Sequence, residues 1–140
     1  MPAKVRTLRQ TAVLPATPHD VYEALLDPKR HAKFSGTPAS LSRRAGGAFS
    51  HYGGALEGFV LFLEKDRRIV EAWRANSWAK GHYSIAEYLL SGSAQGTRVE
   101  FSQYGVPTAA FQGISDGWRK HYWTALRRHF AADRPTTPNV

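Results

Sequence analysis

A carboxylate and an indole lie two residues apart in the middle of the chain, as Glu71 and Trp73. The segment Ile69–Arg74 alternates in the manner of a strand, so these two side chains share one face, with Ile69 beside them. A carboxylate held inside an apolar fold has a raised pKa and could act as an acid, a base or a hydrogen-bond anchor. A register shifted by one residue would turn Glu71 and Trp73 to solvent, so the sequence leaves their face open.

Other residue types that carry chemistry form no recognisable motif. The six histidines lack the spacing of a metal-binding pair, and a chain without cysteine has no thiolate ligand, thiol nucleophile or disulfide. His51 and His82 fall on predicted strands and could meet inside the fold. There is no G-x-S-x-G elbow and no glycine-rich phosphate loop. We therefore predict no metal and no cofactor, and we assign no catalytic residue. The sequence contains no motif that supports catalysis.

Length and composition predict a single domain over residues 1–140, since 140 residues with 42% hydrophobic content suffice for one packed core. No apolar run approaches the roughly 18 residues of a membrane-spanning helix. Residues 1–6 lack the apolar core of a secretory signal. These features predict a cytoplasmic protein that does not insert into membranes.

The formal charge of +8 raises the question of an acidic partner such as nucleic acid. The basic residues occur as short, dispersed pairs that are not interleaved with aromatic residues, as they are in single-strand binders. Arg43, Arg44, Arg67 and Arg68 could gather into a patch at the ends of turns. We nevertheless expect a solvated basic surface and no nucleic-acid binding.

The first elements that must position these residues are a strand and two short helices. Residues 5–14 are predicted to form a strand. Thr17 is placed to cap a helix in which Pro18 occupies the first position, and the pair 27–28, Asp-Pro, ends that helix. A second helical turn is expected over residues 30–34.

From Ala39 to Tyr104 the apolar period is two and turn signals recur, which predicts a meandering antiparallel sheet. The expected strands cover residues 39–44, 47–52, 55–63, 68–75, 81–91 and 97–104. A long helix is predicted from Phe111 to Ala132. One face of that helix carries Ile114, Trp118, Tyr122, Ala125, Leu126 and His129, and Trp123 falls outside it. The ordered core is expected over about 5–132, with a disordered tail over 133–140.

The resulting order, β-α-α-β(6)-α, predicts an α+β fold of the helix-grip type. A single sheet must cover its apolar face, and the C-terminal helix is the one predicted element long enough to do so. A strongly curved sheet wrapped around one helix does not close along its whole length. We therefore expect a cavity between the sheet and this helix.

A series of short motifs runs in order along nearly the whole chain. They are Thr17-Pro18, Phe34, Gly46-Gly47-Ala48-Phe49, Leu56-Glu57-Gly58, Ile69-Val70-Glu71-Ala72-Trp73-Arg74, Trp78, Gly81-His82-Tyr83-Ser84, Gly96-Thr97, Gly105-Val106-Pro107 and Gly117-Trp118. In this order the sequence resembles the C-terminal module of the activator of the heat-shock protein 90 ATPase and its bacterial relatives, from about Gln10 to Phe130. That family belongs to the START-like, or polyketide cyclase-like (SRPBCC), superfamily of small hydrophobic-ligand binders.

The resemblance implies a START/Bet v-like helix-grip fold with an internal cavity. It also implies that Trp73 and Trp118 lie where the sheet and the long helix face each other, and that an uncharged residue is usual at position 71. The eukaryotic activator has a separate N-terminal module that makes much of the chaperone contact. Nothing in this chain corresponds to that module, so the chaperone function is not carried over.

These inferences lead to a first functional hypothesis, in which the chain binds a small hydrophobic or aromatic molecule in the cavity. Trp73 and Trp118 would stack on the ligand, and Glu71 or His82 would orient it. Gly58 in mid-strand would leave space beside the tryptophans or mark a bulge. The complete predicted ligand-binding set is Phe49, Glu71, Trp73, His82, Tyr88, Phe101, Trp118 and Tyr122.

Two alternatives belong to other functional classes. The first is a protein-interaction module such as a chaperone cofactor, which would use the basic turns and an exposed Trp123. It weakens if Trp123 is buried. The second is an enzyme of the cyclase or dehydratase kind, which needs at least two titratable groups in the cavity.

Overall fold

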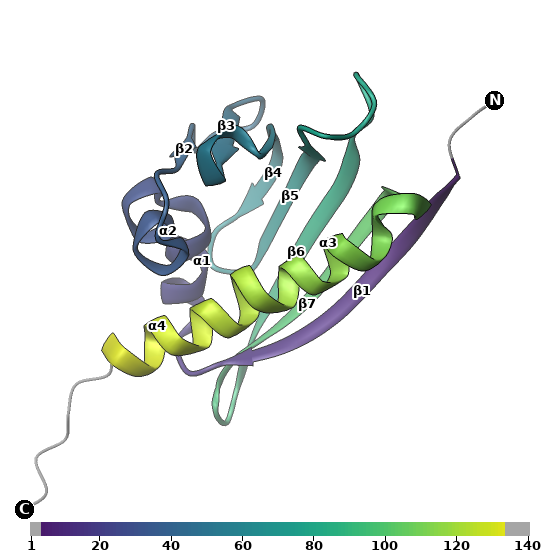
Figure 1. The fold of residues 1–140 in the computed structure, drawn as a ribbon. Helices are drawn as coiled ribbons and strands as arrows, with labels where there is room; N and C mark the ends of the chain where they lie inside the picture. Colours follow the sequence, from purple (N-terminus) through teal and green to yellow (C-terminus); the bar gives the residue numbers. More distant parts are fainter. Residues whose placement is uncertain (1–3, 134–140) are drawn as a thin grey trace, which may run out of the picture.

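One antiparallel sheet of seven strands curves around a long C-terminal helix in the computed structural model, which describes residues 4–133 (Figure 1). The strands are β1 (Val5–Leu14), β2 (Ser40–Leu41), β3 (Ala48–His51), β4 (Leu56–Glu64), β5 (Arg68–Ala75), β6 (Ser84–Ser93) and β7 (Gly96–Pro107), in the spatial order β1-β7-β6-β5-β4-β3-β2. This is the predicted α+β helix-grip fold.

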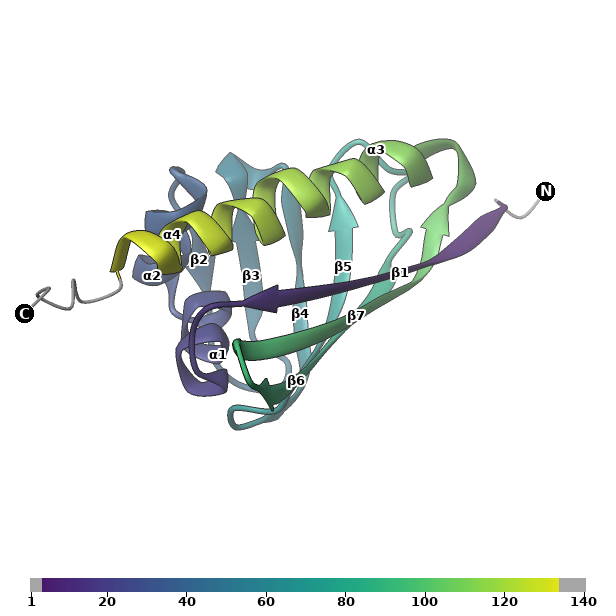
Figure 2. The same ribbon diagram turned by 90° about the horizontal axis from the view of Figure 1, so that it is seen from below.

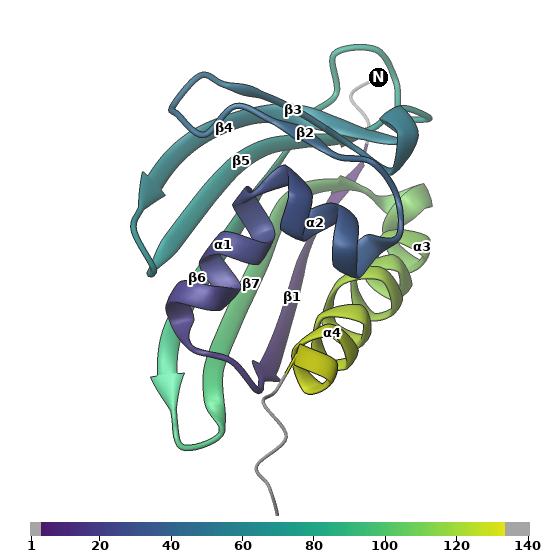
Figure 3. The ribbon, with the colours of Figure 1, turned by 90° about the vertical axis from the view of Figure 1, so that its left-hand side faces the viewer.

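The helical elements cover the concave face of the sheet. They are α1 (Pro18–Leu26), α2 (Pro28–Ser35), α3 (Phe111–Gly117), a π-helical segment (Trp118–Thr124) and α4 (Ala125–Asp133), with short 3-10 turns at Tyr52–Gly54 and Thr108–Ala110. Helix α3, the π-helical segment and α4 form one continuous rod that crosses the sheet (Figure 2). Helices α1 and α2 close one end of the fold, where α2 contacts α4 (Figure 3).

The local signals that predicted α1 act as expected. The Thr17 hydroxyl accepts a hydrogen bond from the Asp20 backbone N–H, and Pro18 is the first helical residue. Helix α2 is longer than the predicted turn because the Asp27 side chain caps its start, while Gly36 ends it in a left-handed conformation with φ of 75°.

Strand positions agree with the prediction to within a few residues, and the largest differences lie at strand ends. Strand β2 is two residues long, and β6 begins at Ser84 because a turn with Gly81 at positive φ precedes it. Strand β7 continues past 104 to Pro107, where it pairs with Val5 of β1. Most of the predicted tail, residues 134–140, lies outside the described residues.

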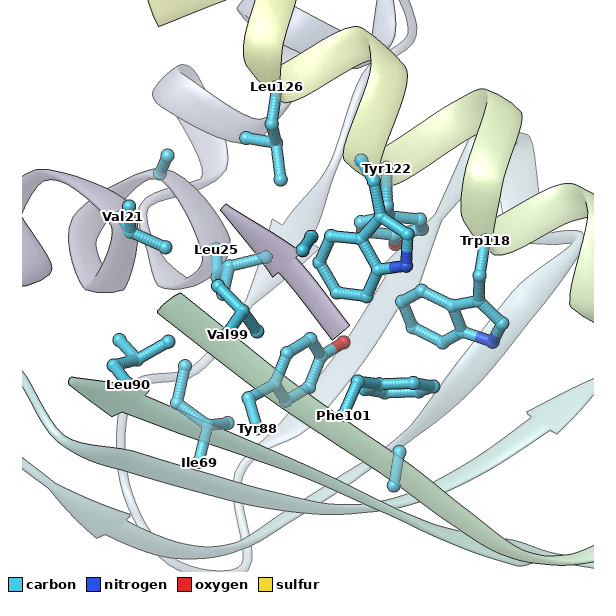
Figure 4. Packing of buried hydrophobic residues seen from close by; sticks show 14 of the residues in the cluster. Val21, Leu25, Ile69, Tyr88, Leu90, Val99, Phe101, Trp118, Tyr122 and Leu126 are labelled. Carbon is cyan, nitrogen blue, oxygen red and sulfur yellow. The ribbon is translucent and has the colours of Figure 1, made fainter. Parts of the chain in front are cut away.

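The core lies between the concave face and the long helix. Strand β5 alternates as predicted, with Ile69, Glu71 and Trp73 buried and the intervening residues more exposed. Trp118 and Tyr122 of the rod reach toward Phe101 on the sheet (Figure 4). The inward face of β5 therefore carries both the carboxylate and the indole that the sequence placed together.

Gly58 on β4 reflects a close approach of two backbones. A Cβ atom at this position would lie 1.8 Å from the Ala72 carbonyl oxygen and 2.8 Å from the Phe49 ring. The expectation that Gly58 leaves space or marks a bulge is wrong, because Phe49 already fills that space and the bulge of β4 falls later, between Val60 and Phe62.

The π-helical segment changes which residues of the rod face the sheet. Trp118, Tyr122, Leu126 and Phe130 are buried at a spacing of four residues. In an uninterrupted α-helix, three such steps would turn the stripe by about 120° away from the sheet. The wider turn of the π-helix offsets this rotation and brings Trp123 inward as well, so Trp123 is 3% exposed.

Candidate functional site

A cavity of about 230 Å³ lies between the rod, strand β5 and the turn that joins β3 to β4. Trp73, Trp118 and Tyr122 are buried and form its aromatic floor. The complete lining is Tyr52, Ala55, Leu56, Trp73, Gly113, Ile114, Gly117, Trp118, His121 and Tyr122. The lining residues other than the floor are partly or fully exposed, so the cavity communicates with solvent.

Two glycines of α3 leave room for this cavity. Gly113 and Gly117 lie one helical turn apart and both line it. A Cβ atom added at either position would meet no atom within 4 Å. Glycine is unfavourable inside a helix by about 1 kcal/mol relative to alanine. The helix therefore gives up stability at the two positions where a side chain would enter the cavity.

The two tryptophans of the floor are fixed by a chain of hydrogen bonds. Trp118 Nε1 donates to Gln103 Oε1 (2.8 Å), Gln103 Nε2 donates to Ser84 Oγ (2.9 Å), and Ser84 Oγ donates to the Trp73 carbonyl oxygen (2.7 Å). The Trp73 and Trp118 ring centroids are 5.6 Å apart. Since Gln103 and Ser84 are fully buried, this network holds the indole of Trp118 in one orientation.

Glu71 lies in the core behind the floor. Its side chain is 4% exposed, and burial raises its pKa to about 7, although a hydrogen bond from Tyr88 opposes the shift. Burial also raises the pKa values of Tyr88 and Tyr122, and the charge of Glu71 adds to both shifts. One carboxyl and two hydroxyl groups therefore influence one another inside the sheet.

A stacked pair of histidines adjoins this cluster. The rings of His31 on α2 and His51 on β3 are 3.9 Å apart, and His31 Nε2 lies 3.1 Å from the Tyr122 hydroxyl. Burial lowers the pKa of His31 to about 3 and that of His51 to about 4, with the His51 charge adding to the shift of His31. Among residues 4–133, no group of three or more metal-ligating side chains converges.

The sequence of the chain matches a known protein family. The model of the family described as "Activator of Hsp90 ATPase homolog 1-like protein" matches residues 15–131. The chain belongs to this family.

Members and neighbours of the family include eukaryotic activators. The chain is 27% identical over 127 residues to the activator of 90 kDa heat shock protein ATPase homolog of Dictyostelium discoideum (90% of this chain, 33% of the relative). It is 24% identical over 124 residues to human homolog 1 (89% and 36%). It is 30% identical over 115 residues to an uncharacterised protein of Schizosaccharomyces pombe (82% and 34%). The chain thus spans about a third of the length of these curated relatives.

Solved structures share the fold. An Hsp90 activator from Plasmodium falciparum superimposes with a TM-score of 0.83 at 19% identity, covering 89% of this chain and 96% of that one. A protein from Chromobacterium violaceum gives a TM-score of 0.71 at 27% identity, with the same coverage. None of the helices within residues 4–133 of this family member is long and apolar enough to cross a membrane.

The structure of this activator-family chain brings together three of the predicted ligand-binding residues at the cavity, namely Trp73, Trp118 and Tyr122. Phe101 lies directly behind them, with its ring 4.2 Å from that of Trp118, and Tyr88 packs on Trp118 at 5.9 Å. These two, with Glu71, form a second layer of the site.

Phe49 and His82 lie apart from that layer. Phe49 stacks on His51, with ring centroids 5.0 Å apart. His82 precedes β6 in a turn, where its Nε2 contacts the Gly105 carbonyl oxygen (2.8 Å) and its ring packs on Trp78. The expectation that His82 lies on a strand and meets His51 is wrong, because the strand starts at Ser84 and His51 stacks on His31 instead.

Sequence reasoning did not assign seven of the residues that line the cavity. They are Tyr52, Ala55, Leu56, Gly113, Ile114, Gly117 and His121. The available signal was the pair of glycines four residues apart within a predicted helix, where glycine is unfavourable. Tyr52 has a positive φ of 54° and precedes two glycines. The Gly53-Gly54 pair indicates a tight turn at this place, but it does not indicate that Tyr52 lines a cavity.

Trp123 is not the exposed anchor that the interaction hypothesis required. Its Nε1 donates to Gln10 Oε1 on β1 (2.7 Å), and Gln10 Nε2 in turn donates to the Ser115 carbonyl oxygen (3.0 Å). Trp123 therefore attaches the rod to β1, as Trp118 attaches it to Gln103 on β7. A protein interface would have to use another surface.

Proposed function

We propose that the chain binds a small, flat, apolar molecule in the cavity between the sheet and the C-terminal rod. The observation that carries this proposal is a solvent-connected cavity with a floor of two tryptophans and a tyrosine. Aromatic rings stack favourably on such a floor. An apolar cavity of about 150 Å³ holds benzene, so 230 Å³ suits one or two fused rings.

Filling the cavity tests this function. Indole binding is measured by calorimetry for the native protein, for Gly117→Leu and for Gln112→Leu. The leucine at 117 enters open space in the cavity, whereas Gln112 is exposed on the same helix outside the cavity lining. We expect Gly117→Leu to fold and to bind indole at least about tenfold more weakly, since the ring loses its contact area, while Gln112→Leu binds as the native protein does.

Two results would count against the function. Equal indole affinity in Gly117→Leu and the native protein would place binding elsewhere. No binding of indole, naphthalene or benzene by the native protein would show that the cavity does not hold apolar rings.

A second candidate function is that of a chaperone cofactor, which the names of the relatives support. One structural observation favours it. Phe59, Ala72, Ile85 and Tyr104 are direct neighbours across four strands and face away from the rod, and three of them are at least 38% exposed. An exposed apolar row of this kind is typical of an interaction surface.

The assay for this candidate uses purified heat-shock protein 90 and phosphate release. If the outer face docks on the chaperone, the native chain changes the ATPase rate and Ile85→Lys removes that effect. Gly117→Leu, altered inside the cavity, should keep it. An unchanged ATPase rate with the native chain at saturating concentration would argue against the cofactor function.

A further inference from the structure

Another cavity, of about 370 Å³, lies at the end of the fold where side chains of α1, α2 and α4 converge (Figure 3). Its lining consists of Asp20, Ala24, Arg30, Lys33, His129 and Phe130. The lining of the apolar cavity described above shares no residue with this set. The two cavities are therefore separate sites, and their chemistry differs.

The walls of this end cavity are charged. Arg30 and Lys33 are three residues apart on α2, a spacing that places both side chains on one face of the helix, and both residues are exposed. From α1, Asp20 contributes one carboxylate, so the lining has two fixed positive charges and one negative charge. The end cavity therefore attracts anions, and the formal charge of +8 on the whole chain adds to this attraction.

Both cations are available to a ligand. The Arg30 guanidinium lies 3.8 Å from the Asp20 carboxylate, which is longer than a hydrogen bond. The Lys33 ammonium makes no hydrogen bond or ion pair with any residue in the described range 4–133. Arginine binds phosphate through paired hydrogen bonds, and lysine binds it as a point charge. The two side chains together thus suit a phosphate group.

The floor of the end cavity is apolar. Ala24 and Phe130 line it and are 1% and 7% exposed. An apolar cavity of about 150 Å³ holds benzene, so 370 Å³ has room for an organic group as well as an anion. The charged walls and the apolar floor therefore favour a ligand that has both parts.

We propose that the end cavity binds a phosphate monoester, with Arg30 and Lys33 on the phosphate and the organic group against Phe130. Asp20 opposes this binding, because its carboxylate lines the same cavity and repels the phosphate. The inference goes beyond the proposed binding of apolar rings, since it concerns other residues and another class of ligand.

The charge pattern provides a test in which two substitutions act in opposite directions. Calorimetry at one ionic strength measures the binding of phenyl phosphate to the native protein, Lys33→Gln, Asp20→Asn and Lys29→Gln. We expect Lys33→Gln to weaken binding about fivefold, as for the loss of one partly exposed ion pair, and Asp20→Asn to strengthen it about threefold. Lys29→Gln removes the same charge from an exposed position of α2 outside the lining and should bind within about twofold of the native protein.

Two results would overturn the site. An equal loss of affinity in Lys33→Gln and Lys29→Gln would show that phosphate is attracted by the basic surface in general. NMR gives the location independently, because the backbone amides of Ala24 and Phe130 must shift with phenyl phosphate while that of Ala55, at the apolar cavity, does not. Shifts at Ala55 alone would place the probe in the apolar cavity.

Vesicles distinguish a soluble phosphate monoester from a lipid that carries the same group. Phosphatidylcholine vesicles with and without phosphatidic acid are sedimented with the same four proteins. Binding of phenyl phosphate without binding to phosphatidic acid identifies a soluble ligand. Sedimentation with phosphatidic acid that Lys33→Gln reduces and Lys29→Gln does not identifies a lipid headgroup in the same site. If neither probe binds, the end cavity is not a phosphate site, and the binding of indole at the apolar cavity is unaffected by that result.

Discussion

At the scale of single residues, the site combines ionisable groups whose burial favours their uncharged forms. Glu71 binds its proton more tightly in the fold, with a pKa raised from 4.5 to about 7. His31 and His51 bind theirs less tightly, with pKa values lowered from 6.5 to about 3 and about 4. These shifts make opposite contributions to stability as the pH changes.

The signs follow from proton linkage. The contribution of Glu71 to stability is complete below pH 4.5 and is lost as the pH rises through 7, because the unfolded chain releases the proton first. The contribution of the histidines is complete above pH 6.5 and is lost as the pH falls toward 4 and 3. Between pH 4.5 and 6.5 the two histidines outweigh one carboxyl, so these groups place the stability maximum near pH 6.5.

Replacement of Glu71 by glutamine isolates the carboxyl. We expect the free energy of unfolding of Glu71→Gln at pH 8, relative to its value at pH 5, to exceed that of the native protein by about 3 kcal/mol. Urea unfolding at the two pH values measures this difference, and all other titrating groups cancel in the comparison. The same pH 5 to pH 8 change in both proteins would show that Glu71 is not held in its protonated form.

At the scale of elements, the turn Tyr52–Gly54 forms the partly exposed wall of the cavity. Tyr52, Gly53 and Gly54 all have positive φ, and only the Tyr52 side chain reaches the rod, through its hydrogen bond to the His121 carbonyl oxygen. A non-glycine residue at positive φ costs of order 1 kcal/mol. The turn therefore contacts the rod through the Tyr52 side chain, whose ring also packs near those of His121 and Tyr122.

Removing the Tyr52 hydroxyl should loosen this turn. In Tyr52→Phe we expect the Ala55 amide, which donates to the Tyr52 carbonyl oxygen, to exchange its hydrogen about fivefold faster, the effect of losing about 1 kcal/mol. Hydrogen exchange followed by NMR measures this rate. The Val99 amide in strand β7, which is paired on both sides by β1 and β6, is the internal control and should not change. Unaltered exchange at Ala55 would mean that the hydrogen bond does not hold the turn.

The elements also show which structural features local sequence patterns can predict and which they cannot. The alternation of β5 correctly predicted that Glu71 and Trp73 share one face, because a strand has a fixed period of two. It left open whether that face is the inner or the outer one, and the structure places both residues in the core. The position of Trp123 was predicted wrongly, since the helical pattern assumes 3.6 residues per turn and the π-helical segment has a wider turn. The contact between His31 and His51 joins α2 to β3, and no local pattern specifies such a pair.

At the scale of the whole molecule, family membership and fold agree, and the sequence motifs indicated both. The described chain adds what motifs do not contain, namely a cavity made by two absent side chains, at Gly113 and Gly117, and a polar cluster behind its floor. The outer face of the sheet bears the apolar row through Ile85, on the side opposite to the cavity. Binding a small molecule and contacting a protein would thus use separate surfaces.

The two tryptophan–glutamine hydrogen bonds make one side of the cavity, the helical rod, harder to displace than the other. Through Trp118 and Trp123 the rod is attached to the neighbouring strands β7 and β1, so it resists sliding along its own axis. The opposite side is a short turn that contacts the rod through the side chain of Tyr52, by one hydrogen bond and by ring packing. A molecule too large for 230 Å³ would therefore displace the turn Tyr52–Gly54 and leave the helix in place. The range of ligand sizes that the cavity accepts would then depend on how easily these three residues move.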